Sequence, residues 1–302
     1  MTPKAGGALT SAVAASGTRA NLHGSLFMVT AMALFAVEDM LLKAATKTVP
    51  VGQVLIVFGA GGMFLFALLA KSQGQRILHP AILSRPILLR CVFEVTGRLF
   101  YTLAIVLTTL SSAAAILQAT PLVVIAGAAI LFGEKVSLAR WAAVVIGLLG
   151  VLVILRPGAD GFSSLSILAI IGTIGFAGRD LATRAAPRVL SNWQLGIYGF
   201  AMMIPAGAGL LAWSGGAVVP VQFALLCLLT AIVTGVGAYA ALTQAMRTGE
   251  VSVVAPFRYS RLLFAILLGV IVFGERPDMA TMIGGAIVVC SGIFALTLGR
   301  RT

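Results

Sequence analysis

The sequence predicts an all-α polytopic membrane protein whose ten transmembrane helices form two inverted five-helix repeats, with the N and C termini in the cytoplasm. Three observations support this fold class. Hydrophobic residues make up 60% of the chain and charged residues only 10%, whereas soluble domains carry roughly a quarter charged residues. Apolar runs recur along the chain, and its second half repeats the first. This composition, with a mean hydropathy of +1.07, excludes a soluble enzyme, a nucleic-acid-binding protein and a disordered chain.

The individual elements follow from the lengths of the apolar runs. A helix that crosses the bilayer needs about 20 predominantly apolar residues. Residues 1–22 precede the first such run and are expected to form a flexible cytoplasmic tail. The two repeats are expected at 23–158 and 163–299. The predicted spans are 24–46, 51–71, 87–108, 111–132, 138–156, 164–186, 192–213, 221–246, 251–273 and 279–298.

The charges of the connecting loops predict the orientation in the membrane. With a cytoplasmic N-terminus, the outside connections carry only Lys47, Arg156 and Arg276. Cytoplasmic loops of membrane proteins are enriched in Lys and Arg. Both termini are therefore expected on the cytoplasmic side of the inner (plasma) membrane. The net charge of +12 then needs no nucleic-acid partner. The basic residues of the inside stretches are Lys4, Arg19, Lys71, Arg76, Arg85, Lys135, Arg140, Arg184, Arg188, Arg247, Arg300 and Arg301.

Two sequence motifs recur at an offset of 141 residues. The motif Phe-Ala-x-x-Asp-x-x-x-Lys/Arg-Ala-Ala occurs at 35–45 and 176–186, and Phe-Gly-Glu-Lys/Arg occurs at 132–135 and 273–276. The chain has only nine acidic residues, so the recurrence of an Asp and a Glu at one offset indicates a duplication. Five helices in each half make the second copy insert upside down, which is typical of transporters with a binding site near the midplane.

With these features the chain resembles the EamA-type ten-helix exporters of the drug/metabolite transporter superfamily. The resemblance covers residues 22–299. It rests on the two five-helix halves, on the Gly-Glu-Lys/Arg element that ends the fourth and ninth spans, and on Pro121 thirteen residues before Glu134. It implies export of small metabolites, often amino acids, without ATP. The amino-acid branch and the drug or nucleobase branches of the superfamily both stay open.

Ionisable residues within the predicted spans must form pairs or face water, because each costs about 2.5–3.5 kcal/mol in lipid. The duplicated aspartates are expected to pair with the basic residue four positions later, as Asp39–Lys43 and Asp180–Arg184, and to serve the architecture. The complete set is Glu38, Asp39, Lys43, Arg90, Glu94, Arg98, Arg179, Asp180, Arg184, Arg258 and Arg261.

Charges found in one half only are the stronger candidates for binding. On the third helix, Arg90, Glu94 and Arg98 are spaced to satisfy one another, which is the structural interpretation. Arg258 and Arg261 have no acid on their own helix, so they need a partner on another helix or an anionic ligand.

We expect the substrate to contact polar side chains at similar depths of the membrane. Apart from the expected aspartate pairs, guanidinium groups outnumber carboxylates, which favours a carboxylate-bearing substrate and above all a zwitterionic amino acid. Its carboxylate would bind Arg258 or Arg261, and its ammonium group Glu38 or Glu94. The candidate site residues are Glu38, Glu94, Arg98, Tyr101, Gln118, Arg179, Tyr239, Gln244, Arg258, Tyr259 and Arg261.

Other residues are expected to shape the helices. Glu134 and Glu275 recur in both halves and are expected to order helix ends. The glycine stripe of 172–178 is expected to let helices approach closely. Three prolines are expected to kink their helices, with a gating hinge beside Arg258 as a further possibility: Pro121, Pro205 and Pro256.

The leading hypothesis is therefore a secondary transporter that exports small metabolites, with amino acids favoured, by alternating access around a midplane cavity. An exporter of nucleobases or organic drugs is the alternative. A channel or a membrane enzyme is disfavoured, since no ring of acids, catalytic motif or intramembrane histidine occurs. No cofactor or metal is expected. Proton coupling through Glu38, Asp39 or Glu94 and simple facilitated diffusion both stay open.

Overall fold

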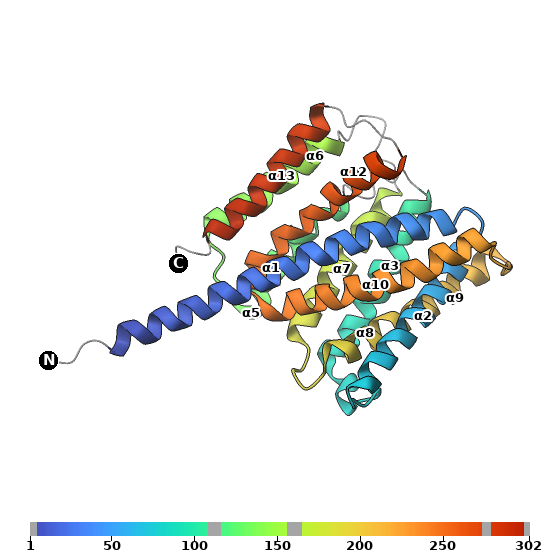
Figure 1. Ribbon diagram of the computed structural model, residues 1–302, viewed down its shortest axis with the longest axis horizontal. Coiled ribbons are helices and arrows are strands. Elements are labelled where there is room, and N and C mark those ends of the chain that lie inside the picture. The colour runs from blue at the N-terminus through green and yellow to red at the C-terminus, as the bar shows by residue number, and fades with distance from the viewer. Residues whose placement is uncertain (1–4, 108–115, 156–164, 274–278, 299–302) are drawn as a thin grey trace.

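The computed structural model describes residues 5–107, 116–155, 165–273 and 279–298. Every regular element in this part of the chain is helical (Figure 1). The elements are α1 (Ala5–Ala45), α2 (Val51–Ser72), η1 (Pro80–Leu83), α3 (Arg85–Leu107), α5 (Thr120–Phe132), α6 (Leu138–Leu155), α7 (Ser166–Ala185), α8 (Asn192–Ala201), α9 (Met203–Ser214), α10 (Gln222–Thr248), α11 (Val251–Val254), η2 (Ala255–Tyr259), α12 (Ser260–Phe273) and α13 (Met279–Leu298).

Four segments are long and apolar enough to cross a bilayer: Gly17–Ala45, Val51–Ser72, Asn192–Ser214 and Gln222–Thr248. Shorter apolar helices lie in α5, α6 and α13. Helices α3 and α7 carry charged residues in mid-helix and are packed against each other. Described elements that are all helical, several of them apolar spans, are typical of a polytopic membrane protein.

The N-terminal segment corrects one expectation. Residues 5–22 continue α1, a single helix of 41 residues, where a flexible tail was expected. The Ala-rich sequence explains the difference, because alanine has the highest helix propensity and no proline follows within the helix. At 1.5 Å per residue the helix is about 60 Å long, and its N-terminal part extends beyond the bundle (Figure 1).

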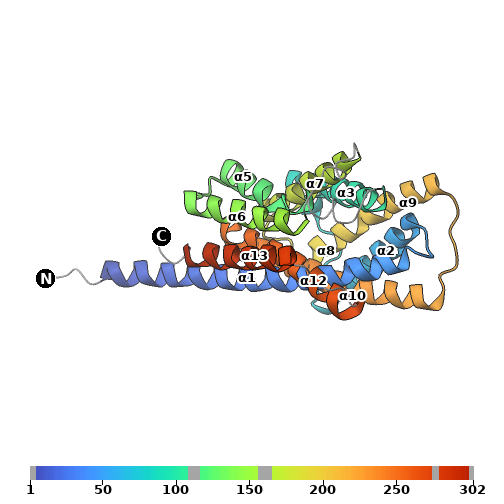
Figure 2. The same cartoon turned by 90° about the horizontal axis from the view of Figure 1, so that it is seen from above.

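Helix contacts follow the sequence repeat. Helix α1 packs against α10 and α12, and α7 packs against α3 and α5. The offset of 141 residues relates α1 to α7, α3 to α10 and α5 to α12, so these two sets of contacts are equivalent. Helix α2 packs against α8 and α9, while α6 packs against α13, and the two run side by side in Figures 1 and 2. These last pairs map onto themselves under the same offset, so the two halves interlock in a regular way.

The glycine stripe on α7 packs against α3, as expected. A Cβ atom added to Gly175 would lie 2.6 Å from the Cα of Gly97, and one added to Gly172 would lie 2.9 Å from the Cβ of Tyr101. Backbones therefore meet at this interface with no room for a side chain. This close approach brings the charged residues of α3 and α7 together.

Two of the three prolines interrupt their helices. Pro205 has no N–H to bond the carbonyl of Ala201, and the chain breaks there into α8 and α9. Pro256 lies in η2, the 3₁₀ turn between α11 and α12. Pro121 instead lies in the first turn of α5, where a missing N–H costs nothing. The regular helix is thus interrupted close to Pro205 and at Pro256.

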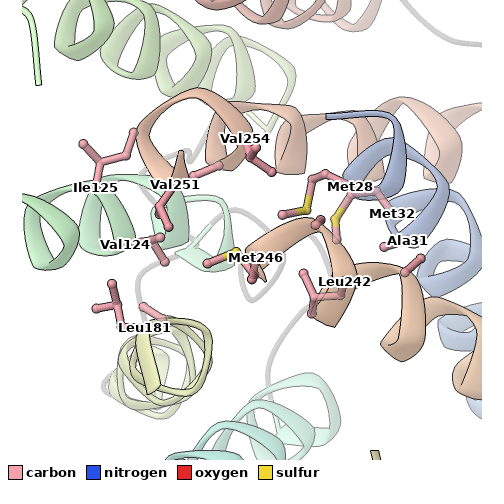
Figure 3. Close-up of a cluster of buried hydrophobic side chains, with 14 of the residues drawn as sticks. Met28, Ala31, Met32, Val124, Ile125, Leu181, Leu242, Met246, Val251 and Val254 are labelled. Atoms are coloured by element: carbon pink, nitrogen blue, oxygen red, sulfur yellow. The ribbon is translucent and has the colours of Figure 1, made fainter. Parts of the chain in front are cut away.

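A buried apolar cluster joins helices of both halves (Figure 3). Met28 and Met32 of α1 meet side chains of α5, α7, α10 and α11 in it. Leu181, which directly follows Asp180, belongs to this cluster and anchors that part of α7. The labelled members are Met28, Ala31, Met32, Val124, Ile125, Leu181, Leu242, Met246, Val251 and Val254.

Candidate functional site

Charged side chains of α1, α3, α7 and the η2–α12 segment, together with Tyr239 of α10, form three adjoining groups of ion pairs and hydrogen bonds, here together called the central charged cluster. It lies where α1, α3, α7, α10 and the η2–α12 segment meet. Glu38 and Glu94 are completely buried, whereas the side chain of Asp39 is 37% exposed. Its members are Glu38, Asp39, Arg90, Glu94, Arg98, Arg179, Asp180, Tyr239, Arg258 and Arg261.

The duplicated aspartates each bind an arginine of the ninth predicted span. Asp180 accepts a hydrogen bond from Arg258, and Asp39 accepts hydrogen bonds from Arg261. The two arginines are three residues apart, on η2 and the first turn of α12. The same segment therefore binds equivalent positions of both halves.

This arrangement corrects the expected pairs Asp39–Lys43 and Asp180–Arg184. Lys43 is exposed, and Arg184 lies 3.8 Å from Glu134 instead. An i,i+4 pair on a helix surface contributes only about 0.2–0.5 kcal/mol. A carboxylate buried between helices needs a close charged partner, so the contacts between helices prevail.

Of the two alternatives for Arg258 and Arg261, the structure shows a partner on another helix, since each binds an aspartate. The cluster holds five arginines and four carboxylates, an excess of one positive charge. Arg90 donates only to uncharged oxygens among its described partners: Thr183 Oγ1 at 2.9 Å, the Leu195 carbonyl at 2.8 Å and the Tyr239 hydroxyl at 2.7 Å.

The charged residues of α3 bind other helices rather than one another, contrary to the structural interpretation. Glu94 accepts a 2.5 Å hydrogen bond from Tyr239 and a 3.4 Å bond from Arg179. Arg98 donates to Glu38 at 3.3 Å. Helix α3 therefore connects α1, α7 and α10 through polar contacts.

Ion pairs within the cluster differ in how completely their atoms are bonded. Arg179 donates twice to Asp180, from Nε at 3.0 Å and Nη2 at 2.9 Å. Arg98 makes one contact to Glu38, and Nε of Arg98 and Oε2 of Glu38 are buried without a hydrogen-bond partner in the described part of the chain. The Glu38–Arg98 pair is therefore the less saturated of the two.

Aromatic rings lie against the guanidinium groups. The repeat-equivalent Phe35 and Phe176 lie 5.2 Å from Arg261 and 5.0 Å from Arg179, respectively. The guanidinium of Arg98 lies 6.0 Å from the same Phe176 ring. Such contacts attract a cation to the ring face and exclude water from the ion pairs.

Tyr101 and Gln118 are buried, as expected of site residues. The Tyr101 ring packs edge-on against Phe176 at 5.7 Å, so it borders the central charged cluster.

Two expected site residues lie elsewhere. Gln244 accepts a hydrogen bond from Asn192 and donates to Thr248 at 3.1 Å, at the end of α10. The Tyr259 hydroxyl donates to the Val144 carbonyl at 3.0 Å and fixes α6 to η2. Similar depth in the membrane does not imply the same helix face, which explains why these two residues lie apart from the cluster.

Conversely, three members of the cluster were not among the candidate site residues: Asp39, Arg90 and Asp180. The recurrence of the aspartates suggested architecture alone. The signal that could have placed them in the site is the proximity in sequence of Asp39 to Glu38 and of Asp180 to Arg179.

Glu134 orders a helix end, as expected, but in the other half. It accepts a hydrogen bond from the backbone N–H of Ser252 at 3.3 Å, in the first turn of α11. Arg140 supports the same turn by donating to Glu250 and to the Ser252 hydroxyl, both at 3.0 Å. Glu275, its repeat counterpart, lies outside the described residues.

The structure has an apolar hollow that no cluster residue lines. An open groove of about 590 Å³ lies among α3, α5, α6 and α7 and is lined by apolar residues such as Phe93, Leu122 and Trp141. The cluster itself is largely buried by its neighbours. Among the described residues, the side chains of Asp39 and Arg261 are the more accessible members of the cluster, at 37% and 18% exposure.

Comparison with known proteins gives consistent matches over nearly the whole chain. Residues 22–156 and 163–297 each match the family described as the EamA-like transporter family. The chain is 26% identical to a riboflavin transporter of Rhizobium johnstonii over 90% of both chains. It is 29% identical to the pseudopaline exporter CntI of Pseudomonas aeruginosa, over 89% of this chain and 94% of that protein.

Two further matches extend the comparison. An S-adenosylmethionine uptake transporter of Rickettsia conorii is 23% identical over 70% of this chain and 72% of its own. A solved crystal structure superimposes with a TM-score of 0.77 at 22% identity, and the match covers 92% of this chain and 98% of that one. This last likeness shows a shared fold.

Proposed function

The chain belongs to the EamA-like transporter family, and from this premise we propose that it is a secondary transporter that exports small metabolites, with amino acids favoured, by alternating access. The family and the relatives make it a multi-pass transporter of the inner membrane rather than an enzyme. The cargo, the direction and the mechanism are the proposal.

The proposed topology has ten spans in two inverted repeats, at 23–158 and 163–299, with both termini cytoplasmic. The double match to one family and the loop charges support it. So does the contact pattern, in which α1–α10 and α7–α3 are equivalent interfaces. Two copies related in this way can rock about a site between them.

The observation that carries the mechanism is that ion pairs join the two halves at the centre. Asp39 of α1 binds Arg261 of α12, and Glu94 of α3 binds Arg179 of α7. If the halves move apart on one side, these pairs open and their charged groups meet water and substrate. Charged groups that stayed buried throughout would only cost stability. A transport cycle that exposes them in turn gives them a function in binding.

An amino acid suits the balance of charges in the cluster. The cluster contains both carboxylates and guanidinium groups. The ammonium group of a zwitterion can bind a carboxylate and its own carboxylate can bind a guanidinium group, so it can take the place of an ion pair within the protein without adding net charge. S-Adenosylmethionine, named for one relative, contains an α-amino acid group. The relatives include an exporter and an uptake transporter, so direction is part of what must be measured.

An exporter of nucleobases or organic drugs is the second candidate. Aromatic rings support it, because Phe66, Phe200 and Tyr239 lie within 6.1 Å of one another beside the cluster. The riboflavin transporter among the relatives is named for a cargo with a planar aromatic ring system.

Counterflow into proteoliposomes tests the proposal. Vesicles with purified protein are loaded in turn with an unlabelled amino acid, riboflavin or a nucleobase, and uptake of the labelled compound is followed. We expect accumulation with at least one amino acid and none in protein-free vesicles. Accumulation of riboflavin or a nucleobase alone would replace the amino-acid proposal with the second candidate, and no flux of any compound would reject both.

Proton coupling is tested in the same vesicles. A pH gradient of either sign is imposed at equal substrate concentration inside and outside. Coupling through Glu38, Asp39 or Glu94 predicts that the gradient drives net substrate movement, and facilitated diffusion predicts none. The direction of movement in a gradient also shows whether export or uptake is favoured in the cell.

A further inference from the structure

We propose that Glu38 and Arg98 form the subsite that binds the charged end of a zwitterionic substrate, with the substrate ammonium group on Glu38 and its carboxylate on Arg98. This inference rests on the proposed function and assigns its specificity to one ion pair. Arg98 thereby takes the role of carboxylate site that the sequence suggested for Arg258 or Arg261, because both of these arginines bind aspartates.

The first argument is the unused bonding capacity of this pair. Nη1 of Arg98 contacts Oε1 of Glu38 at 3.3 Å. Oε2 of Glu38 and Nε of Arg98 are both buried and have no hydrogen-bond partner within the described ranges. A free acceptor and a free donor in one pair complement a ligand that brings a donor and an acceptor, as an ammonium group and a carboxylate do.

The two other carboxylates of the cluster that are fully buried, Glu94 and Asp180, are better satisfied. Glu94 has a partner on each oxygen, Tyr239 on one and Arg179 on the other. Asp180 likewise binds Arg179 through one oxygen and Arg258 through the other. A ligand would have to displace strong bonds at these positions, whereas at Glu38 it gains bonds that the protein leaves unmade.

The second argument is a difference between equivalent interfaces. At the α7–α3 interface, Arg179 faces Glu94. The equivalent residues at the α1–α10 interface are Glu38 and Gly235, so Glu38 faces a residue without a side chain. A Cβ atom added to Gly235 would lie 3.2 Å from Oε2 of Glu38. Helix α10 thus supplies no charged partner to Glu38 at the position where α3 supplies one to Arg179, and the substrate ammonium group would bind Oε2 of Glu38 there.

The third argument concerns the rest of the substrate. Phe58 and Phe176 lie 5.7 and 6.0 Å from the Arg98 guanidinium, and Tyr101 packs on Phe176. A substrate with its charged end on Glu38 and Arg98 would therefore place its side chain among aromatic rings. The pair points to amino acids with apolar or aromatic side chains, which enter when the two halves separate.

The test uses three related probes: L-phenylalanine, its methyl ester, which keeps only the amine, and N-acetyl-L-phenylalanine, which keeps only the carboxylate. Each is measured as a competitor of labelled L-phenylalanine counterflow in proteoliposomes. Wild-type protein should prefer the zwitterion to either derivative by about tenfold or more, since each lost charged bond is worth about that factor.

Two substitutions separate the two roles. Glu38→Gln should remove the preference for the zwitterion over the N-acetyl derivative, and Arg98→Gln its preference over the methyl ester. Arg140→Gln is the matched control, because Arg140 is buried and binds Glu250 outside the cluster, and it should keep both preferences. Unchanged preferences in both cluster variants would overturn the subsite, as would a Glu38→Gln variant that loses only its response to a pH gradient.

The outcomes also separate this inference from the proposed function. If wild-type protein carries riboflavin but no amino acid, the substrate class fails together with the subsite, while transport stands. If it carries L-phenylalanine with selectivity that neither variant changes, only the subsite fails. Should Glu38→Gln not yield folded protein, Gly235→Ala replaces it. This variant keeps both charges and places a methyl group 2.5 Å from the Phe58 ring and 3.2 Å from Oε2 of Glu38. It therefore fills space on both the charged and the aromatic side of the subsite, and an undiminished preference for the zwitterion would reject the proposal.

Discussion

The hydroxyl group of Tyr239 donates a 2.5 Å hydrogen bond to Oε2 of Glu94 and so joins α10 to α3, helices of opposite halves. The same hydroxyl accepts a hydrogen bond from Arg90 at 2.7 Å. One oxygen atom thus connects a carboxylate and a guanidinium group that are both buried. Its removal leaves each with one partner fewer.

Tyr239→Phe should therefore destabilise the protein by about 1–3 kcal/mol, the cost of buried polar groups left unsatisfied. The substitution keeps the ring and its contacts with Phe66 and Phe200. Thermal unfolding of the purified protein in detergent measures the effect. Tyr198→Phe is the control: among its described partners its hydroxyl binds only backbone groups, the Ile77 carbonyl and the His79 N–H, so its loss leaves no charged group without a partner and should lower the midpoint less. Equal losses would contradict the central role of Tyr239.

The duplicated aspartates should differ in their importance for stability. The Asp180 side chain is 1% exposed and binds two arginines, whereas that of Asp39 is 37% exposed and binds one. Asp180→Asn leaves Arg179 and Arg258 undercompensated in a buried site, at a cost of about 3–5 kcal/mol. Asp39→Asn should cost clearly less. Unfolding midpoints of the two variants, measured side by side, decide between this order and its reverse.

Arg258→Ala should weaken counterflow far more than Arg188→Ala. Arg258 is buried and binds Asp180 in the cluster, while Arg188 is an exposed residue of the α7–α8 connection. The comparison is made by initial rates in proteoliposomes at equal protein content. Equal loss of transport in both variants would show that the cluster does not govern transport.

Gly175→Ala should impair the contact between α3 and α7. The new methyl group would lie 2.6 Å from the Cα of Gly97, where backbone rather than a flexible side chain is in the way. Gly209→Ala in α9 is the matched control, since nothing lies within 4 Å of its added Cβ. It should be neutral or stabilising, because alanine favours helix by about 1 kcal/mol over glycine. The yield of monodisperse protein and its unfolding midpoint are the measurements, and similar values for both variants would contradict the argument.

Much of the fold could be predicted from the sequence because bilayer thickness sets the length of apolar runs. The break at Pro205 and the close approach at Gly175 also follow from single residues. The extension of α1 to Ala5 could not be read from hydropathy, since an Ala-rich segment of modest hydropathy forms helix equally well outside a membrane.

The members of the site could be predicted better than their partners. Glu38, Glu94 and Arg258 stand out as charges in apolar runs, but sequence spacing shows only which residues share a helix face. It therefore suggested Asp39–Lys43, while the structure pairs Asp39 with Arg261, 222 positions away. Partners at such separations depend on how helices pack, which local spacing does not determine.

Arg258 and Arg261 share one short stretch of backbone but bind aspartates from different halves of the chain. A shift of that stretch would act on both bonds together. A transporter whose two halves are linked through one segment in this way would resist opening to both compartments at once. This would protect the cell from leakage of its metabolites and ions down their gradients.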